Sequence, residues 1–261
     1  MHSRSIHPLV VAGAVLVSWG CAKQPADVVE QPREVAGQCQ AAFGAQVCSW
    51  ATLAGSKVVA LGATIPMAAI EQSPAEAPMV WPPATEAVIP MPAEASAATG
   101  VDHLTVYWEP HGHPPGPYLT PHFDFHFYVI SDSARRAMDC ADASKPTELP
   151  NGYALPDIDI PGIGMLKGLC VPQMGMHALE AAALSGTTLF TGAMVMGYYA
   201  GKPIFFEPMI SKAMLLEKKS FSLALPTPAG APGNVHFPTK FQADYDASLP
   251  GYRFVFSDFT M

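Results

Sequence analysis

The chain has 261 residues, of which 49% are hydrophobic and only 14% are charged. That apolar content is enough to bury a sizeable core, which argues against a disordered chain. Asp and Glu outnumber Lys and Arg by 22 to 14, and the net charge of −8 repels anionic polymers, which argues against a nucleic-acid partner. The 27 prolines and 21 glycines indicate many turns and short segments, as in β-rich folds.

The N-terminus has the features of a bacterial secretion signal. Residues 1–20 hold Arg4 and then an apolar run, Leu9–Trp19, that is too short to span a bilayer as a stable helix. A small residue directly precedes Cys21, an arrangement that resembles a lipobox. We therefore expect lipidation of Cys21, a polar tether over residues 21–38, and a lipoprotein anchored by its lipid in the bacterial cell envelope, facing the periplasm or the exterior. The alternative is a cysteine that follows an ordinary signal peptide by chance.

Four further cysteines remain, an even number that indicates disulfides in an exported chain. Three pairings are open. We favour Cys39–Cys48 with Cys140–Cys170, because each bond then closes a loop within one local segment. The sequence has no CxxC spacing, so neither a thioredoxin-type site nor a zinc knuckle is indicated.

The first half of the domain is expected to hold strands separated by turns, over Gln46–Leu53, Lys57–Ile65 and Asp102–Glu109. Seven prolines between Pro66 and Pro92 argue against a helix or a central strand there. That segment is expected to run over the surface with short edge pairings at Val80–Trp81 and Val88–Ile89, and a disordered linker between two domains is the alternative.

The second half mixes short helices with further strands. Ser131 can cap a helix over Ser133–Cys140, Asn151–Gly168 has the composition of a loop, and His177–Leu184 and Ile210–Lys219 have helical character. Further strands are expected over Leu189–Tyr199, Pro203–Met209, Phe221–Leu225, Phe237–Tyr245 and Tyr252–Phe259. These elements predict a single domain over residues 39–261, mainly β, sandwich or barrel-like, with two or three short helices.

The stretch PHFDFHFY carries the clearest functional pattern. Its polar and aromatic residues alternate strictly, and successive side chains of a strand point to opposite faces. His122, Asp124 and His126 therefore share one face, while three phenylalanines share the other. We expect the aromatic face to pack in the core and the polar face to form a binding site.

Imidazole and carboxylate groups in this number suit a divalent ion such as Zn²⁺, Mn²⁺, Fe²⁺ or Cu²⁺, and zinc is favoured. The two histidines of the strand lie about 13 Å apart, too far to bind one ion easily without a bend. Ligands from other segments are therefore needed, and the predicted metal-binding set is His113, His122, Asp124, His126, His177 and Glu207. His103 and His236 are left out, since an isolated histidine more often has a surface or hydrogen-bonding role.

Two other interpretations of the cluster stay open. Buried imidazoles and carboxylates can form a hydrogen-bond network without a metal. Met174 and Met176 beside His177 could indicate copper, although methionine more often fills cores. Motifs such as HExxH, GxSxG, a P-loop or GxGxxG are absent from the sequence, so the sequence does not decide whether the protein is an enzyme.

Four sequence blocks, EPHGHPPGPY, PHFDFHFY, VPQMGMH and GYYAGKPIFFEPMI, resemble in this order a bacterial family of exported proteins classed as a domain of unknown function. The resemblance spans roughly residues 40–261 and implies one β-rich domain with no assigned activity. The first block departs from the family pattern at Glu109 and His111, which argues against these two as ligands.

The favoured function is divalent-metal binding in the cell envelope. A metal-dependent enzyme is the second hypothesis, and Glu109 or Glu207 would then serve as its general base. A structural or homo-oligomer-forming envelope protein, with histidines that only hold the fold together, is the third.

Overall fold

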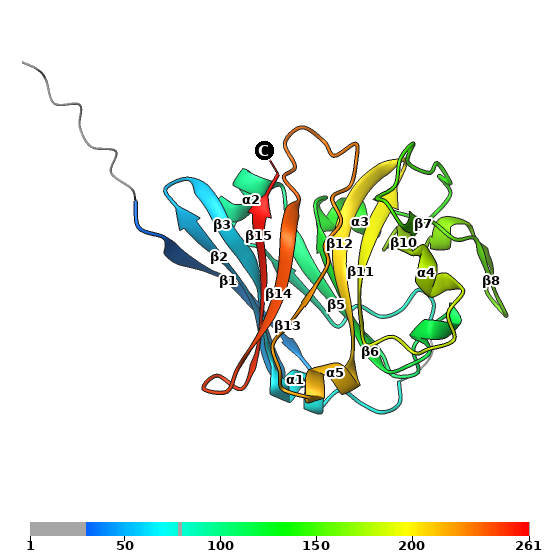
Figure 1. Ribbon diagram of the computed structural model, residues 1–261, viewed down its shortest axis with the longest axis horizontal. Coiled ribbons are helices and arrows are strands. Elements are labelled where there is room, and N and C mark those ends of the chain that lie inside the picture. The colour runs from blue at the N-terminus through cyan, green and yellow to red at the C-terminus, as the bar shows by residue number, and fades with distance from the viewer. Residues whose placement is uncertain (1–29, 78–79, 261) are drawn as a thin grey trace, which may run out of the picture. The chain divides into compact units, whose positions relative to one another are not determined.

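The computed structural model describes residues 30–77 and 80–260, and the described residues from Gln31 onward form one compact unit (Figure 1). The predicted secretion signal, Cys21 and most of the predicted tether lie outside the described residues. Within the described ranges, none of the helices has the length and apolar content needed to cross a membrane.

Two antiparallel sheets make up most of the fold (Figure 1). The first has six strands in the spatial order β1 (Arg33–Ala42), β2 (Ala45–Ala54), β3 (Lys57–Pro66), β15 (Gly251–Phe259), β14 (Pro238–Asp246) and β13 (Phe221–Leu223). The second has seven, in the order β4 (Ala87–Pro90), β5 (His103–Glu109), β6 (His122–Tyr128), β12 (Lys202–Ser211), β11 (Gly192–Tyr199), β10 (Met176–Glu180) and β7 (Tyr153–Ala154). A separate hairpin pairs β8 (Ile158–Ile160) with β9 (Gly164–Leu166).

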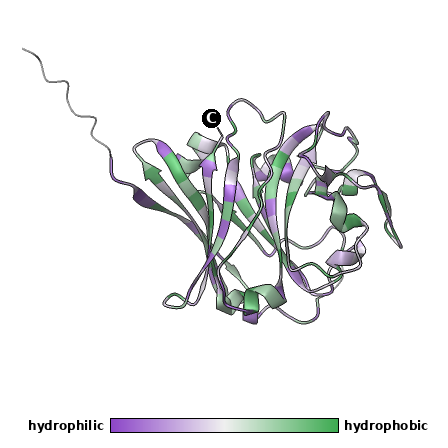
Figure 2. Ribbon diagram, in the orientation of Figure 1, coloured by the Kyte–Doolittle hydropathy of each residue, from purple (hydrophilic) through white to green (hydrophobic). Residues whose placement is uncertain are grey.

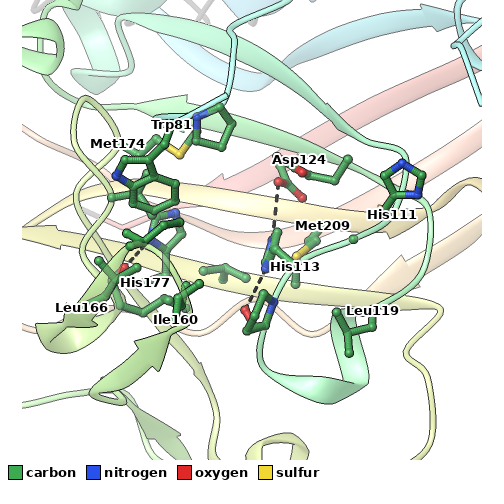
Figure 3. A pocket seen from close by; sticks show the side chains of 18 of the residues that line it. Trp81, His111, His113, Leu119, Asp124, Ile160, Leu166, Met174, His177 and Met209 are labelled. Carbon is green, nitrogen blue, oxygen red and sulfur yellow. Dashed lines mark hydrogen bonds and ion pairs between the residues drawn. The ribbon is translucent and has the colours of Figure 1, made fainter. Parts of the chain in front are cut away.

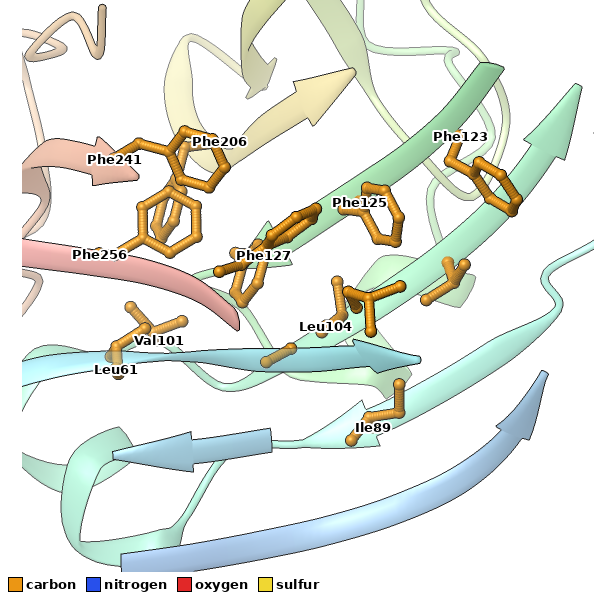
Figure 4. Packing of buried hydrophobic residues seen from close by; sticks show 14 of the residues in the cluster. Leu61, Ile89, Val101, Leu104, Phe123, Phe125, Phe127, Phe206, Phe241 and Phe256 are labelled. Carbon is orange, nitrogen blue, oxygen red and sulfur yellow. The ribbon is translucent and has the colours of Figure 1, made fainter. Parts of the chain in front are cut away.

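The two sheets pack face to face through aromatic side chains, which confirms the β-rich, sandwich-like expectation. The ring of Phe127 on β6 lies 4.7 Å from that of Phe256 on β15, and Phe125 lies 4.9 Å from Phe254. Figure 4 shows Phe125, Phe127 and Phe256 between strands of both sheets. Polar and apolar residues alternate along many strands because only one face of each sheet meets the other (Figure 2).

Five short α-helices join the strands, more than the two or three expected: α1 (Met67–Glu71), α2 (Ala93–Thr99), α3 (Asp132–Arg136), α4 (Ala181–Leu184) and α5 (Lys212–Leu216). The expected helix over His177–Leu184 is only half helical. Its first residues form β10, where Met176 pairs with Tyr198, because strand pairing overrides a weak helix propensity. Likewise β12 continues to Ser211, whose hydroxyl caps α5 by accepting from the Met214 amide.

Three other boundaries differ from expectation. Strand β1 starts at Arg33, so residues 33–38 belong to a sheet and not to the tether. Strand β1 is a mostly exposed edge strand, so its sequence is polar, and a polar sequence at this position is also what a linker would have. No strand forms at Val80–Trp81, which precedes two prolines that lack an amide donor. The predicted loop Asn151–Gly168 contains β7, β8 and β9.

The predicted disulfides Cys39–Cys48 and Cys140–Cys170 are both present. The second joins residues 30 apart in sequence, against 9 for the first, and a longer loop loses more entropy in the unfolded chain when it is closed. We expect the double variant Cys140→Ser/Cys170→Ser to lose roughly 3–4 kcal/mol of unfolding free energy, about 1 kcal/mol more than Cys39→Ser/Cys48→Ser. Urea denaturation of both variants measures the difference. An equal or reversed order would contradict the loop-entropy argument.

Candidate metal centre

Strand β6 sits in the middle of the seven-stranded sheet and presents its polar residues to the face that points away from the other sheet. Met209 of β12 pairs with Asp124, which places Glu207, two residues earlier, beside His126. On the other side, Tyr107 of β5 pairs with Asp124. Both carboxylates and His126 are therefore held by regular strand backbone at the centre of a sheet.

His126, His177 and Glu207 form a buried group that we call the His126 triad. Nε2 of His126 lies 3.4 Å from Nε2 of His177 and 3.4 Å from Oε2 of Glu207. The three side chains come from β6, β10 and β12, three strands of one sheet. Three potential ligand atoms thus converge from different elements on one point.

The local contacts of His177 fix its orientation. Its Nδ1 donates to the carbonyl oxygen of Leu169 at 3.0 Å, which leaves Nε2 with a free lone pair in the neutral ring. Burial lowers the pKa of His177 to about 4, and it lowers that of His126 well below its usual value, with His177 adding to the effect. Both rings are therefore neutral at pH 7, the form that binds metals.

Glu207 is only 1% exposed, and its Oε2 makes no hydrogen bond to the described residues. Burial, followed by the nearby charge of Asp124, raises the pKa of Glu207 well above its usual value. Burial therefore favours the protonated carboxyl group over the bare carboxylate, and a bound cation would reverse that preference.

His113, His122 and Asp124 form a second group, the His122 triad. Nε2 of His122 lies 3.2 Å from Oδ1 of Asp124, and Nε2 of His113 lies 3.8 Å from Oδ2. The Nδ1 atoms contact backbone carbonyls, that of His122 at 2.7 Å from Thr120 and that of His113 at 2.9 Å from Pro114. Every Nε2 of this group consequently faces the carboxylate.

Charge pairing dominates the His122 triad. Burial alone would raise the pKa of Asp124, but the adjacent His122 outweighs it and brings that pKa down to about 2. In the same way burial would lower the pKa of His122, and the carboxylate raises it instead. His122 and Asp124 are thus stabilised as an imidazolium–carboxylate pair, whereas burial lowers the pKa of His113.

A cavity of about 380 Å³ opens beside both triads (Figure 3). His113 and Asp124 of one triad and His177 and Glu207 of the other line it. The six predicted residues are therefore brought together, but in two groups. The separation of His122 from His126 follows from their spacing along one strand, as expected.

The other histidines take different places. His103 is buried on β5, where it stacks on Tyr128 at 5.0 Å and contacts Asp102 through Nδ1 at 2.8 Å. His236 contacts the Thr260 carbonyl at 2.7 Å, and neither belongs to a triad. Glu109 and His111 line the cavity without joining a triad.

Sequence reasoning missed several residues of the site. The Leu169 carbonyl that orients His177 has no sequence signal, since any residue supplies a carbonyl. Trp81 also lines the cavity, and a tryptophan in a proline-rich surface segment is a signal that could have found it.

The profile of a family described as TTHB210-like, "Hypothetical protein TTHB210", matches residues 55–108, which are 54 of the 261 residues. The match covers β3 to β5 and contains neither triad. No curated protein and no solved structure matches the chain significantly.

Glu109 offers a test of the cavity's electrostatics. Burial, and then the charge of Asp124, raises its pKa to about 8. A raised pKa in the folded state stabilises the fold below the unfolded pKa near 4.5, and this contribution is lost as the pH rises toward 8. In metal-free protein, Glu109→Gln should therefore flatten the fall of unfolding free energy between pH 5 and pH 8 seen in urea titrations. The exposed Glu148→Gln serves as control, and an unchanged slope in Glu109→Gln would refute the assignment.

Proposed function

We propose that this protein binds one divalent metal ion, with zinc favoured, through Nε2 of His126, Nε2 of His177 and a carboxylate oxygen of Glu207. The observation that carries the proposal is the pair of 3.4 Å separations in the His126 triad. Bonds of about 2.0–2.1 Å in a tetrahedral site place ligand atoms roughly 3.3–3.4 Å apart. Two histidines and one carboxylate are also a ligand set found in catalytic zinc sites.

The burial of Glu207 supports the same assignment. A buried carboxyl group without a hydrogen bond on one oxygen costs folding free energy, and a bound cation would offset that cost. The His122 triad is the weaker candidate, because its carboxylate already has a cationic partner in His122. We assign the His122 triad a second role, in which its imidazolium–carboxylate pair sets the electrostatic field beside the ion without binding it.

The proposal includes a place in the cell. The secretion signal and Cys21 support an exported lipoprotein held to the membrane of the bacterial envelope by its lipid. Two disulfides agree with an oxidising compartment.

Elemental analysis by mass spectrometry tests the proposal. The full chain is purified in detergent, without a His-tag or a chelator. We expect close to one zinc, manganese, iron or copper ion per chain in the wild type, and a loss of that ion in His126→Ala. The variant His236→Ala, at a half-buried histidine that belongs to neither triad, serves as a control that keeps the metal. A folded wild-type protein without metal, which fails to take up zinc on dialysis, would leave the triads as a hydrogen-bond network.

A metal-dependent enzyme is the second candidate, and the cavity favours it. His177 and Glu207 line a space large enough for a small molecule, so an ion there would keep a coordination position open to it. Glu109 lines the same space, and its pKa of about 8 suits a group that exchanges a proton near neutral pH. Cobalt substitution tests for the open position, since its visible spectrum should shift when azide is added; an unchanged spectrum indicates a closed, structural site.

A further inference from the structure

The walls of the cavity are apolar, whereas its floor also carries titratable groups. The floor is formed largely by the sheet, where Asp124, His177 and Glu207 lie beside the apolar side chains of Leu179, Val195 and Met209. The residues that line the cavity from outside these strands are mostly apolar, among them Val80, Trp81, Leu119, Ile160, Ile163 and Met174. In Figure 3, Trp81, Met174, Ile160 and Leu166 are drawn on the same side as His177. The apolar wall is thus next to the triad proposed to hold the ion.

The solvent-exposed rim of the cavity is also apolar. Nine large apolar side chains are exposed in the described part of the chain, and four of them line this one cavity, with exposures of 47% for Val80, 40% for Trp81, 53% for Leu119 and 39% for Ile163. A fifth, Met165, lies between two lining residues of the β8–β9 hairpin. Apolar residues that are exposed together at the mouth of a cavity often mark a ligand site, whereas apolar residues exposed singly are common on any protein surface.

The polar groups on the floor limit the charge and polarity that the head group of such a ligand can have. Among the described residues, no Lys or Arg lines the cavity, and the one carboxylate that lines it with a lowered pKa, Asp124, is already paired with His122, so an anionic head group would find no free positive partner in the absence of a metal ion. A purely apolar ligand would cover these groups and leave them without partners. A metal ion in the His126 triad resolves both difficulties, because its open position accepts an oxygen atom.

We propose that the cavity binds a small amphiphile whose oxygen-bearing head group coordinates the metal ion and whose apolar body packs against Trp81, Met174 and the β8–β9 hairpin. This inference rests on the metal site proposed above. The volume of about 380 Å³ lies near the lower end of the roughly 300–1,000 Å³ of small-molecule pockets. The ligand is therefore a compact molecule and not a whole membrane lipid.

Two hydroxamic acids test the proposal, since they share a metal-binding head group and differ in the apolar body. Octanohydroxamic acid and acetohydroxamic acid are titrated by calorimetry into the full chain, loaded with zinc and checked for zinc content by mass spectrometry. Six additional methylene groups that are even partly buried should make the octanoyl compound bind at least about tenfold tighter. In Trp81→Ala this ratio should fall toward one, with zinc content and acetohydroxamic acid affinity unchanged. Leu249→Ala, an exposed apolar position outside the cavity, should keep the wild-type ratio.

The outcomes separate the two proposals. Zinc binding with equal affinity for both hydroxamic acids would overturn the amphiphile and leave the metal site standing. Failure to load zinc would overturn the metal site, and the amphiphile proposal with it. Zinc-free protein that binds octanohydroxamic acid as tightly as zinc-loaded protein would show that the head group does not reach the ion, which also overturns the proposal.

Discussion

Glu207→Gln is expected to lower zinc affinity by more than about 100-fold without lowering the stability of the metal-free protein. Mutating a residue that only orients a metal ligand typically costs 10–100-fold in affinity, and loss of an anionic ligand costs more. The metal-free fold should tolerate the change because burial keeps the Glu207 carboxyl protonated, and glutamine has the same shape and no charge. At pH 4, where Glu207 is protonated in both the folded and the unfolded chain, we expect the unfolding free energy to stay within about 1 kcal/mol of the wild type, and at pH 7 the variant should be the more stable of the two. A chelator-competition titration measures the first quantity and urea denaturation the second.

The same residue should make zinc binding depend on pH. The ion displaces the proton of Glu207, so each pH unit below the raised pKa should weaken zinc binding about tenfold. Without metal the sign is opposite: the raised pKa contributes stability below the usual value of 4.5, and that contribution is lost as the pH rises through the folded-state pKa. His177, with its pKa of about 4, competes with zinc only in more acidic solution. Glu207→Gln should therefore flatten both profiles above pH 5.

Glu109→Gln is the matched control for zinc binding. It makes the same chemical change in the same cavity, but Glu109 belongs to neither triad. We expect its zinc affinity to stay within a few-fold of the wild type. Equal losses in both variants would show that the cavity's overall charge, and not a ligand bond from Glu207, attracts the ion.

The alternation in PHFDFHFY was sufficient to predict both faces of β6. A period of two fixes which side chains share a face wherever the strand sits, and the core aromatic residues on the other face confirm it. The local disulfides were predictable for a related reason. Cys39 and Cys48 lie directly opposite each other on a hairpin, a contact set by short-range chain geometry.

The division into two triads was not predictable from sequence. Glu207 reaches His126 only because β12 pairs with β6 in one particular register. His177 joins them only because β10 lies two strands beyond β12 in the same sheet. Such long-range order has no local signal. The β8–β9 hairpin was also hidden, since its strands are only three residues long and the turn between them contains Pro161 and Gly162, which gives the segment the composition of a loop.

Phe127→Ala is expected to lower the unfolding free energy by about 3–5 kcal/mol, the usual cost of removing a buried aromatic ring. Phe127 is fully buried, and its ring lies 5.5 Å from that of Phe206 and 4.7 Å from that of Phe256 on the opposite sheet. The substitution opens a cavity where the two sheets meet, because the surrounding rings are fixed by their own neighbours. Urea denaturation of metal-free protein measures the loss.

Phe221→Ala is the control, since it removes the same ring from the half-buried edge strand β13 and should cost less. An equal cost at both positions would contradict a core centred on β6. If Phe127→Ala is folded in the absence of urea, we expect it to bind zinc as the wild type does, because Phe127 and His126 point to opposite faces of the strand. Phe127→Ala should then lower stability and leave zinc affinity unchanged, whereas Glu207→Gln should lower zinc affinity without lowering stability. A loss of zinc in folded Phe127→Ala would show instead that the packing of the core sets the geometry of the triad.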